Sequence, residues 1–413
     1  MYSLHLSPEQ LEIRDTVRDF VTEKIKPVML EPERLNVCDR RLSMAVLDQA
    51  SQMGLRTLAL SEDHGGAGAD HLTSCIVAEE LAAGDADLAA ALTETSRLAH
   101  LIFDEAMTDA QRDRFLPQFL KDDRHHLAFA EREAGGDTKL GVNYHRSTAP
   151  QAAIKTTAVK AADGQWSVNG RKTCVANAPI AALFAVLVNV PDRAIPKVLL
   201  VPADAAGLDV HAGDTAWLHG CHGDVSFKDC RVAADNMLND SATVLLTGAD
   251  AHGREMPLLQ AIDLGIGRAA YTMAVDYAKL RVQGGRPIIE HQAIATKLAD
   301  IAIRLEVARA IVWQAAWASD HSAAVADRSL SDLPLTTIAQ VFTGETILQA
   351  VKDAAEVFGA MGVMRDMPLQ KYVHDARVCL HSGDGNGDAR LRLAEVIARY
   401  RRGDVAVPAT AAE

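Results

Sequence analysis

Two carboxylates of this chain stand where they could take a proton from a substrate. Glu255 lies in segment 253–257, at the entrance to an apolar helical pattern. An apolar pocket there would raise the pKa of its carboxyl group and suit it to general-base chemistry. The neighbouring Arg254 favours a plainer interpretation, a surface charge near a helix N-terminus, and local sequence alone favours that one. Asp384, with a glycine on each side, is most simply a turn residue.

Two glycine-rich segments could bring backbone N–H groups close to a phosphate or a carbonyl oxygen. They are 134–137, Ala-Gly-Gly-Asp, and 382–387, Ser-Gly-Asp-Gly-Asn-Gly. Such segments can bind anions, although a plain turn and a helix break are the simpler interpretations. No GxGxxG follows a strand and no Walker pattern occurs, so neither a Rossmann site nor a P-loop is expected.

A pair of arginines marks a third candidate site. Arg281 and Arg286 flank Gly284 and Gly285 between two long helical patterns. Arginines at this spacing could hold phosphates or carboxylates. A solvated turn between two helices is the alternative.

The cysteines and histidines give no convincing metal motif. The six cysteines include no CxxC pair, and Cys221 and Cys230 lie near His219 and His222. A strand edge with incidental histidines explains that group better than a ligand set, so no metal site is predicted. Reduced thiols in a cytoplasm are the default interpretation.

Composition excludes several classes of protein. The 413 residues carry a net charge of -13, and 48% are hydrophobic. An acidic chain is a poor nucleic-acid binder. No apolar run approaches the roughly 20 residues of a membrane-spanning helix, and the first residues show no signal-peptide pattern, so a cytoplasmic protein is expected.

The patterns predict an α+β protein in three parts. Helical periodicity covers 1–125, strand-like runs cover 126–245, and helical periodicity returns over 246–404, before a flexible tail at 405–413. The pairs Asp163-Gly164 and Asn169-Gly170 each predict a hairpin turn. Helices are expected near 42–53, 72–83, 264–281, 291–320, 337–358 and 391–402.

Three segments in this order resemble the acyl-CoA dehydrogenase family. Segment 130–137 resembles its TEPxAGSD motif, segment 281–292 its RxxFGxxxxxxQ motif, and segment 375–391 its RDA…YEGTxxIQR ending. The resemblance covers essentially the whole chain. It implies an N-terminal helical domain, a central β domain and a C-terminal four-helix bundle. It also implies FAD, bound between the β domain and the bundle with help from a partner subunit.

The resemblance assigns cofactor-binding residues by position. One group would line the flavin ring, one would reach the FAD of a neighbouring subunit, and three glycines would lie along the cofactor and the acyl-CoA. The groups are, in turn, Leu127, Phe129, Ala130, Cys174, Val175 and Ala176; Arg281, Gln292, Glu356, Gly359 and Ala360; and Gly136, Gly385 and Gly387.

Several positions depart from the family pattern. Ala130 and Ala176 replace threonines that usually bond the flavin ring, Cys174 replaces a tryptophan, and Gly284 replaces a phenylalanine. Segment 141–155 looks inserted beside the active site. An unusual flavin environment and substrate are therefore expected.

The catalytic base is also displaced. Gly383 occupies the position of the glutamate that most members use, whereas Glu255 aligns with the base of isovaleryl- and long-chain acyl-CoA dehydrogenases. This pairing makes Glu255 the favoured base. The resemblance then implies that the N–H of Gly383 and a flavin hydroxyl polarise a thioester carbonyl, that Glu255 takes the α proton, and that the β hydride passes to flavin N5.

Other outcomes stay open at this point. Relatives of this fold include flavin monooxygenases, nitroalkane oxidase and desulfinases, and a flavin-free relative is a third option. The substrate would be an acyl-CoA or an acyl-carrier thioester. By resemblance only, the partners would be further copies of the chain in a tetramer or dimer, and an electron-transfer flavoprotein.

Overall fold

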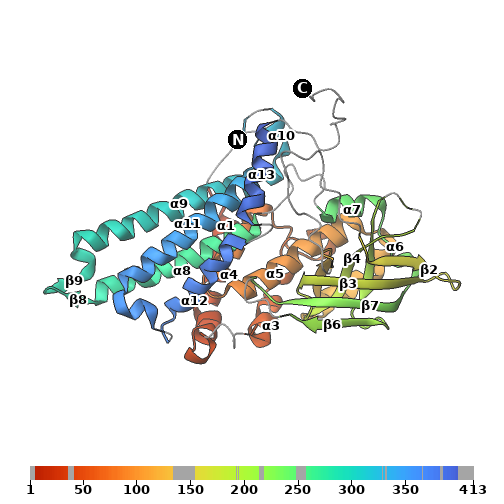
Figure 1. Ribbon diagram of the computed structural model, residues 1–413, viewed down its shortest axis with the longest axis horizontal. Helices are drawn as coiled ribbons and strands as arrows, with labels where there is room; N and C mark the ends of the chain where they lie inside the picture. Colours follow the sequence, from red (N-terminus) through yellow and green to blue (C-terminus); the bar gives the residue numbers. More distant parts are fainter. Residues whose placement is uncertain are drawn as a thin grey trace, which may run out of the picture.

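The computed structural model describes residues 5–35, 41–133, 154–191, 193, 195–213, 218–247, 257–327, 329–330, 333–364, 366–381 and 385–398. Glu255, Gly383, Gly136 and almost all of the inserted-looking segment 141–155 therefore lie outside the described residues. Figure 1 shows helices over most of the molecule's length and a β domain at one end.

The N-terminal helices begin at well-formed caps. Ser7 accepts from Gln10 N, and the Gln10 side chain accepts from Ser7 N, which is a capping box. The side chains of Asp70 and Asp85 cap the helices that begin at His71 and Ala86 by accepting from Thr73 N and Leu88 N. The helices are α1 (Pro8–Phe20), α2 (Lys26–Met29), α3 (Met44–Gln52), α4 (His71–Ala82), α5 (Ala86–Ala99) and α6 (Asp109–Lys121).

The β domain contains two sheets. In the order β1-β4-β5, β1 is parallel to β4, and the order β2-β3-β7-β6 is antiparallel throughout. The strands are β1 (His126–Ala130), β2 (Thr157–Lys160), β3 (Trp166–Ala176), β4 (Ala181–Val188), β5 (Lys197–Pro202), β6 (Leu208–Ala212) and β7 (His222–Val232).

One predicted hairpin turn is confirmed and the other is wrong. Asp163 and Gly164 do join the antiparallel pair β2 and β3. Asn169 and Gly170 instead lie inside β3, where the pairing with β7 shifts register. A Cβ on Gly170 would lie 2.6 Å from the Thr156 Cα, so this glycine serves close backbone approach rather than a turn.

The C-terminal part is a bundle of long helices. Its helices α8 and α9 are joined by a small hairpin, β8 (Val282–Gln283) with β9 (Arg286–Pro287), visible at the far end of the molecule in Figure 1. The helices are α8 (Leu258–Leu280), α9 (Gln292–Asp320), α10 (Ser322–Ala326), α11 (Leu335–Val357), α12 (Leu369–Val378) and α13 (Asn386–Ile397), with α7 (Asp240–Thr247) preceding them.

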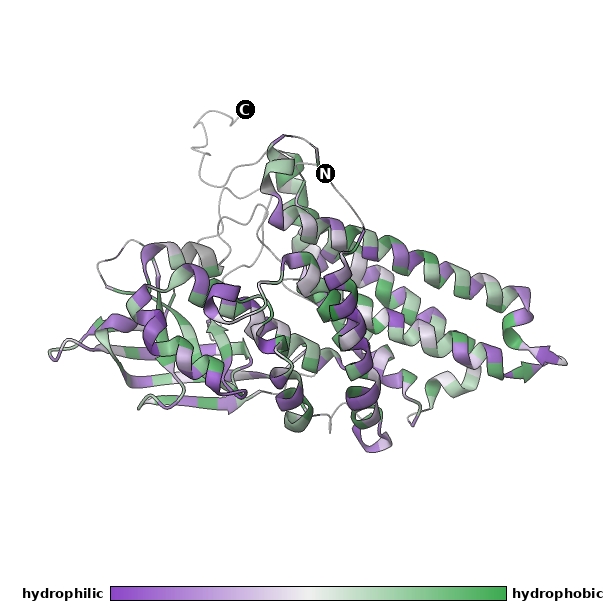
Figure 2. Cartoon of the chain, turned by 180° about the vertical axis from the view of Figure 1, so that it is seen from behind, coloured by the Kyte–Doolittle hydropathy of each residue, from purple (hydrophilic) through white to green (hydrophobic). Residues whose placement is uncertain are grey.

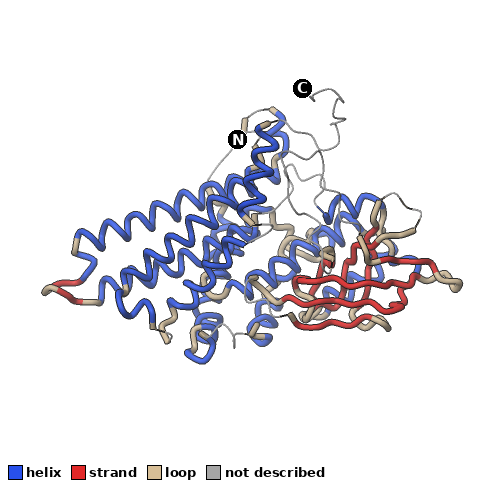
Figure 3. Tube along the Cα trace, viewed as in Figure 1, coloured by secondary structure: helices blue, strands red, loops and turns tan. Residues whose placement is uncertain are grey.

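The N-terminal helices and the bundle share one hydrophobic core. It runs from Val17 and Leu47 through Leu264 to Ile347 and Cys379. Helix α8 packs closely on α4, where a Cβ at position 265 would meet the Glu79 carbonyl oxygen at 2.3 Å. The β domain has two further cores, one under its three-stranded sheet and one between its sheets. Figure 3 shows this separation of helices from strands.

The long helices are amphipathic rather than uniformly apolar. Hydrophilic residues recur along the bundle helices in Figure 2. Within the described part of the chain, no helix is both long and apolar enough to cross a membrane.

Candidate functional site

Six of the residues assigned to the flavin ring lie together on β1 and at the end of β3. Leu127, Ala130 and Val175 are buried, and the other three are half-buried. The chain leaving β1 continues beside β3, because Thr173 N donates to the Arg132 carbonyl oxygen at 3.0 Å. We call this group the β-domain wall: Leu127, Phe129, Ala130, Cys174, Val175 and Ala176.

The end of β3 has a strained backbone. Cys174 has φ +51° and Asn177 has φ +62°, although neither is a glycine. The pairing of β3 with β7 shifts register between Lys172 and Val175, and Cys174 N donates to the Asp224 carboxylate at 3.2 Å. Backbone strain of this kind gathers at functional sites, where surrounding contacts hold it.

A buried ion pair holds the two strands of the wall together. The Lys172 ammonium lies 2.6 Å from the Glu133 carboxylate and also donates to the Glu131 carbonyl oxygen at 3.1 Å. Glu133 accepts from the N–H and hydroxyl of Thr156 at 3.3 and 3.2 Å. Burial lowers the pKa of Lys172, and its contact with Glu133 opposes that effect. The pair fixes the chain immediately before segment 134–137.

A second group of assigned residues lines a hollow of about 540 Å³ at the far end of the bundle. Arg281, Glu356, Gly359 and Ala360 all line it, beside the stacked rings of Tyr277 and Phe358. Gln292 begins α9 nearby but does not line the hollow. We call these five exposed residues the bundle wall: Arg281, Gln292, Glu356, Gly359 and Ala360.

The bundle wall leaves room for a polar ligand. Gly359 has φ +57° and open space where a Cβ would point. The Glu356 carboxylate pairs with Lys297. Arg286, the second arginine of the hairpin, lies 3.5 Å from the His291 ring and does not line the hollow. Arg281 is thus the arginine that faces this space.

The bundle wall lies beside the β8–β9 hairpin, whereas the β-domain wall lies where β1 and β3 meet α5, since Asn177 donates to the Ala91 carbonyl oxygen at 2.9 Å. Figure 1 places the β8–β9 hairpin at one end and the β domain at the other. Gly385 and Gly387 lie in neither wall. Asn386, between them, donates to the Val341 carbonyl oxygen at 3.5 Å, about 22 Å along α11 from Glu356. One chain therefore does not gather all the assigned residues around one ligand.

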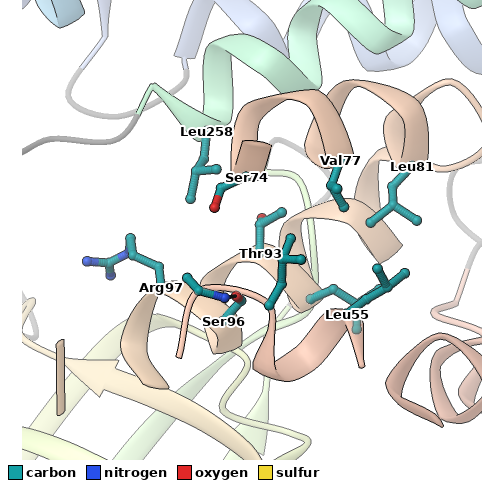
Figure 4. Close-up of a pocket in the computed structure, with 11 residues that line it drawn as sticks. Leu55, Ser74, Val77, Leu81, Thr93, Ser96, Arg97 and Leu258 are labelled. Carbon is teal, nitrogen blue, oxygen red and sulfur yellow. Dashed lines mark hydrogen bonds between the residues drawn. The ribbon is translucent and has the colours of Figure 1, made fainter. Parts of the chain in front are cut away.

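A small apolar cavity lies between α4, α5 and the start of α8 (Figure 4). It is very small, about 10 Å³, which is room for no more than one water molecule. Leu258, Ser74 and Thr93 face one another there, and Leu258 follows Glu255 by three residues. The lining residues are Leu55, Leu58, Ala59, Ser74, Val77, Leu81, Leu92, Thr93, Ser96, Arg97 and Leu258.

Most polar groups of this cavity are already bonded. The Thr93 hydroxyl donates to the Ala89 carbonyl oxygen at 2.7 Å, and the Ser96 hydroxyl accepts from Ala59 N at 2.9 Å. Arg97 is paired with Glu94 through two hydrogen bonds. The cavity therefore offers a mainly apolar lining. The lining residues come from α4, α5, the start of α8 and residues 55–59 and share no local motif, so the sequence does not indicate the cavity.

The family of this chain is shown by its match to models of known protein families. Three family models match the chain in order: the acyl-CoA dehydrogenase N-terminal domain over 7–123, the middle domain over 145–230 and the C-terminal domain over 251–396. The chain belongs to the acyl-CoA dehydrogenase family. This confirms the resemblance and the α+β fold class predicted from the sequence.

Curated relatives of this acyl-CoA dehydrogenase family member span nearly its whole length. An acyl-CoA dehydrogenase of Bacillus subtilis (strain 168) is 28% identical over 385 residues, covering 91% of this chain and 94% of that protein. Benzylmalonyl-CoA dehydrogenase of Aromatoleum aromaticum is 28% identical over 404 residues, covering 95% and 98%.

Solved structures share the fold. Butyryl-CoA dehydrogenase from Megasphaera elsdenii matches with a TM-score of 0.81 and 23% identity, over 96% of this chain and 100% of that one. The structure of PigA with FAD and proline matches with a TM-score of 0.79 and 19% identity, over 96% and 99%. The family models and the curated acyl-CoA dehydrogenase relatives show that this protein is an oxidoreductase.

Proposed function

We propose that this protein is an FAD-dependent dehydrogenase that introduces an α,β double bond into an acyl-CoA thioester. The observation that carries the proposal is the match of the three acyl-CoA dehydrogenase domain models over 7–123, 145–230 and 251–396. Glu255, the favoured base, precedes Leu258 by three residues in the sequence, and Leu258 begins α8.

The described residues fit FAD. In the β-domain wall, the half-buried Phe129, Cys174 and Ala176 offer side-chain and backbone groups for a ring system, and the other three residues pack in the protein core behind them. The bundle wall offers an exposed arginine and an open glycine, which suit a pyrophosphate. When bound, FAD supplies the hydride acceptor for the oxidation. Gly385 and Gly387 would add backbone groups, since neither has an atom within 4 Å of where a Cβ would point.

The chain's own residues would handle the proton and the carbonyl oxygen. Glu255 would hold the proton taken from the α carbon, and exclusion of water by the acyl chain would favour its protonated form. The backbone N–H of Gly383 stabilises the enolate oxygen, a task that needs no side chain. A glycine at 383 is therefore compatible with a base at 255.

The FAD site would be completed by a second copy of the chain. This is supported by the exposed bundle wall, whose hollow is lined by no residue of the β-domain wall of the same chain. Apolar side chains stand exposed beside the bundle wall, Leu280 at 82% and Val363 at 77%. A homodimer or homotetramer would bury them. An electron-transfer flavoprotein as acceptor, an acyl-carrier thioester in place of acyl-CoA, and a cytoplasmic location stay predictions.

The test compares Glu255→Gln with the wild-type protein in anaerobic mixing with acyl-CoAs. We expect the variant to bind FAD normally and to reduce it about 10²- to 10⁴-fold more slowly, because the α proton has no acceptor. Asp384→Asn, the other carboxylate considered, is the matched control and should keep the wild-type rate. Normal reduction in Glu255→Gln would remove the base assignment.

The changed residues of the β-domain wall favour one second candidate. Alanines at 130 and 176 and the strained Cys174 give a flavin environment that a monooxygenase or oxidase of this fold could use. A flavoprotein that consumes oxygen and is reduced by no thioester would support that candidate.

A further inference from the structure

Three buried side chains from three separate segments meet that belong to neither wall and do not line the small apolar cavity. They are His219, just before β7, Asp263 on α8, and Cys379, which opens the short turn Cys379–His381 after α12. One nitrogen, oxygen or sulfur atom of each lies within 4.8 Å of the other two. All three residues are buried, Asp263 with only 1% exposed.

Two members of this cluster have polar atoms without a partner of normal hydrogen-bond geometry, the Asp263 carboxylate and Nε2 of His219. The Cys379 thiol contacts that carboxylate and donates to the Asp375 carbonyl oxygen at 3.7 Å. Leaving such groups unpaired away from water is costly. The atoms that lack partners are lone-pair donors, which are the atoms that metal ions bind.

The surroundings carry an excess of negative charge. The Lys371 ammonium lies 2.7 Å from the Asp375 carboxylate and 3.3 Å from that of Asp85. Asp87 and Asp263 add two more carboxyl groups. Such a gathering of carboxyl groups around one ammonium would attract a cation.

His219 has a ring nitrogen available for a ligand. Its Nε2 is buried and has no hydrogen-bond partner. The Asp87 carboxylate lies 4.0 Å from Nδ1, beyond hydrogen-bond distance, and accepts from Gly220 N at 2.9 Å. Nε2 is therefore the nitrogen that a metal could bind.

We propose that His219, Asp263 and Cys379 bind one zinc ion. A neutral imidazole, a carboxylate and a thiolate balance the 2+ charge of the ion, so the buried site is neutral overall. Binding replaces the thiol S–H bond with a bond from sulfur to the metal and releases that proton to solvent. Ligand atoms about 2.0–2.3 Å from the ion leave a fourth position for water.

The site would tie three parts of the fold together. Asp263 belongs to the bundle and His219 to the β domain, and Cys379 lies four residues before Gly383. In the sequence, His219 lies near Cys221, His222 and Cys230, and no metal site is predicted from that spacing. The partners found here are 44 and 160 positions away, beyond the reach of any spacing motif.

The test measures zinc by elemental analysis in the untagged full-length protein, after exposure to zinc and removal of loosely held metal. We expect about one zinc ion per chain in the wild type and less than about a tenth in Asp263→Asn and Cys379→Ser. Cys230→Ser, another buried cysteine, is the matched control and should retain zinc. Circular dichroism checks that each variant is folded.

A second readout uses cobalt in place of zinc. Wild-type protein loaded with Co²⁺ should show a thiolate-to-cobalt absorption band that Cys379→Ser lacks and Cys230→Ser keeps. Wild-type protein with neither zinc nor this band would overturn the proposal, as would equal zinc in all variants. Neither measurement uses enzyme activity, so the result stands apart from the proposed dehydrogenation.

Discussion

The β-domain wall and the bundle wall differ in burial, charge and position. The first is built from buried or half-buried residues on two strands, and the second from five exposed residues that include an arginine and a glutamate. The first lies where β1 and β3 meet α5, and the second lies beside the β8–β9 hairpin at one end of the molecule (Figure 1). This division suits a ligand with an apolar ring at one end and phosphates in its middle.

The two walls also differ in what holds their residues in place. The β-domain wall depends on a buried ion pair and a strained strand end, so its geometry is fixed within one chain. The bundle wall has an open hollow and exposed apolar neighbours, so a second chain would complete it. Changes to the first wall should therefore affect stability, and changes to the second should affect binding and assembly.

The largest effect is expected from Lys172→Met in the β-domain wall. It leaves the buried Glu133 carboxylate unpaired, which should cost about 3–5 kcal/mol of unfolding free energy. Lys197→Met is the control, because its partner Asp240 is 73% exposed and keeps its hydration. Denaturant unfolding measures both, and equal losses would show that the wall is not specially supported.

The second effect separates the two arginines of the hairpin. Arg281→Gln should weaken FAD binding by about 10- to 100-fold, the loss of a charged hydrogen bond of roughly 1.5–3 kcal/mol. Arg286→Gln should bind FAD as the wild type does, since Arg286 does not line the hollow. Titration of FAD into apoprotein measures the affinities. Equal weakening by both variants would contradict the assignment of Arg281.

A smaller effect tests the assembly. Val363→Asp places a charge on an exposed apolar site beside the bundle wall and should shift the protein toward monomer, together with FAD loss. Ile195→Asp changes a 47% exposed side chain of the β domain and should leave the molecular mass unchanged. Light scattering after size exclusion measures the mass. A Val363→Asp protein that keeps its wild-type mass would place the interface elsewhere.

The smallest effect concerns the helices beneath the β-domain wall. The His100 ring donates to the carboxylates of Asp104 and Glu105, and these bonds raise the pKa of His100 to about 9, with Asp104 the larger cause. A raised pKa means that the folded protein holds this proton more tightly than the unfolded chain. The stabilisation is therefore full below about pH 6.5 and is lost as the pH rises toward 9. His100→Gln should lack this decline in melting temperature, and an unchanged decline would assign it to another group.

Elements with strong periodicity were predictable from the sequence. The helix expected over 291–320 is α9, Gln292–Asp320, and the helix expected over 337–358 is α11, Leu335–Val357. Their apolar residues recur at helical spacing, and no proline interrupts them. Gly170 misled because a glycine after asparagine is typical of a turn, whereas here it admits a neighbouring backbone inside a strand.

The site was only partly predictable. Arg281, Glu356, Gly359 and Ala360 were assigned by resemblance, and the structure brings these four together. Cys174 gave no local signal of its left-handed backbone, and Asp263 gave none of its burial beside His219 and Cys379. These features arise from contacts between segments far apart in the sequence. The roles of Glu255 and Gly383 stay predictions, since both lie outside the described residues.

FAD-dependent acyl-CoA dehydrogenation is tested most directly by the visible spectrum of the purified protein, recorded before and after anaerobic addition of a panel of acyl-CoAs. We expect a yellow flavoprotein whose colour is bleached by at least one thioester, and the most effective thioester would identify the acyl class. A colourless protein that takes up no FAD, or a yellow one that no thioester bleaches, would contradict FAD-dependent acyl-CoA dehydrogenation.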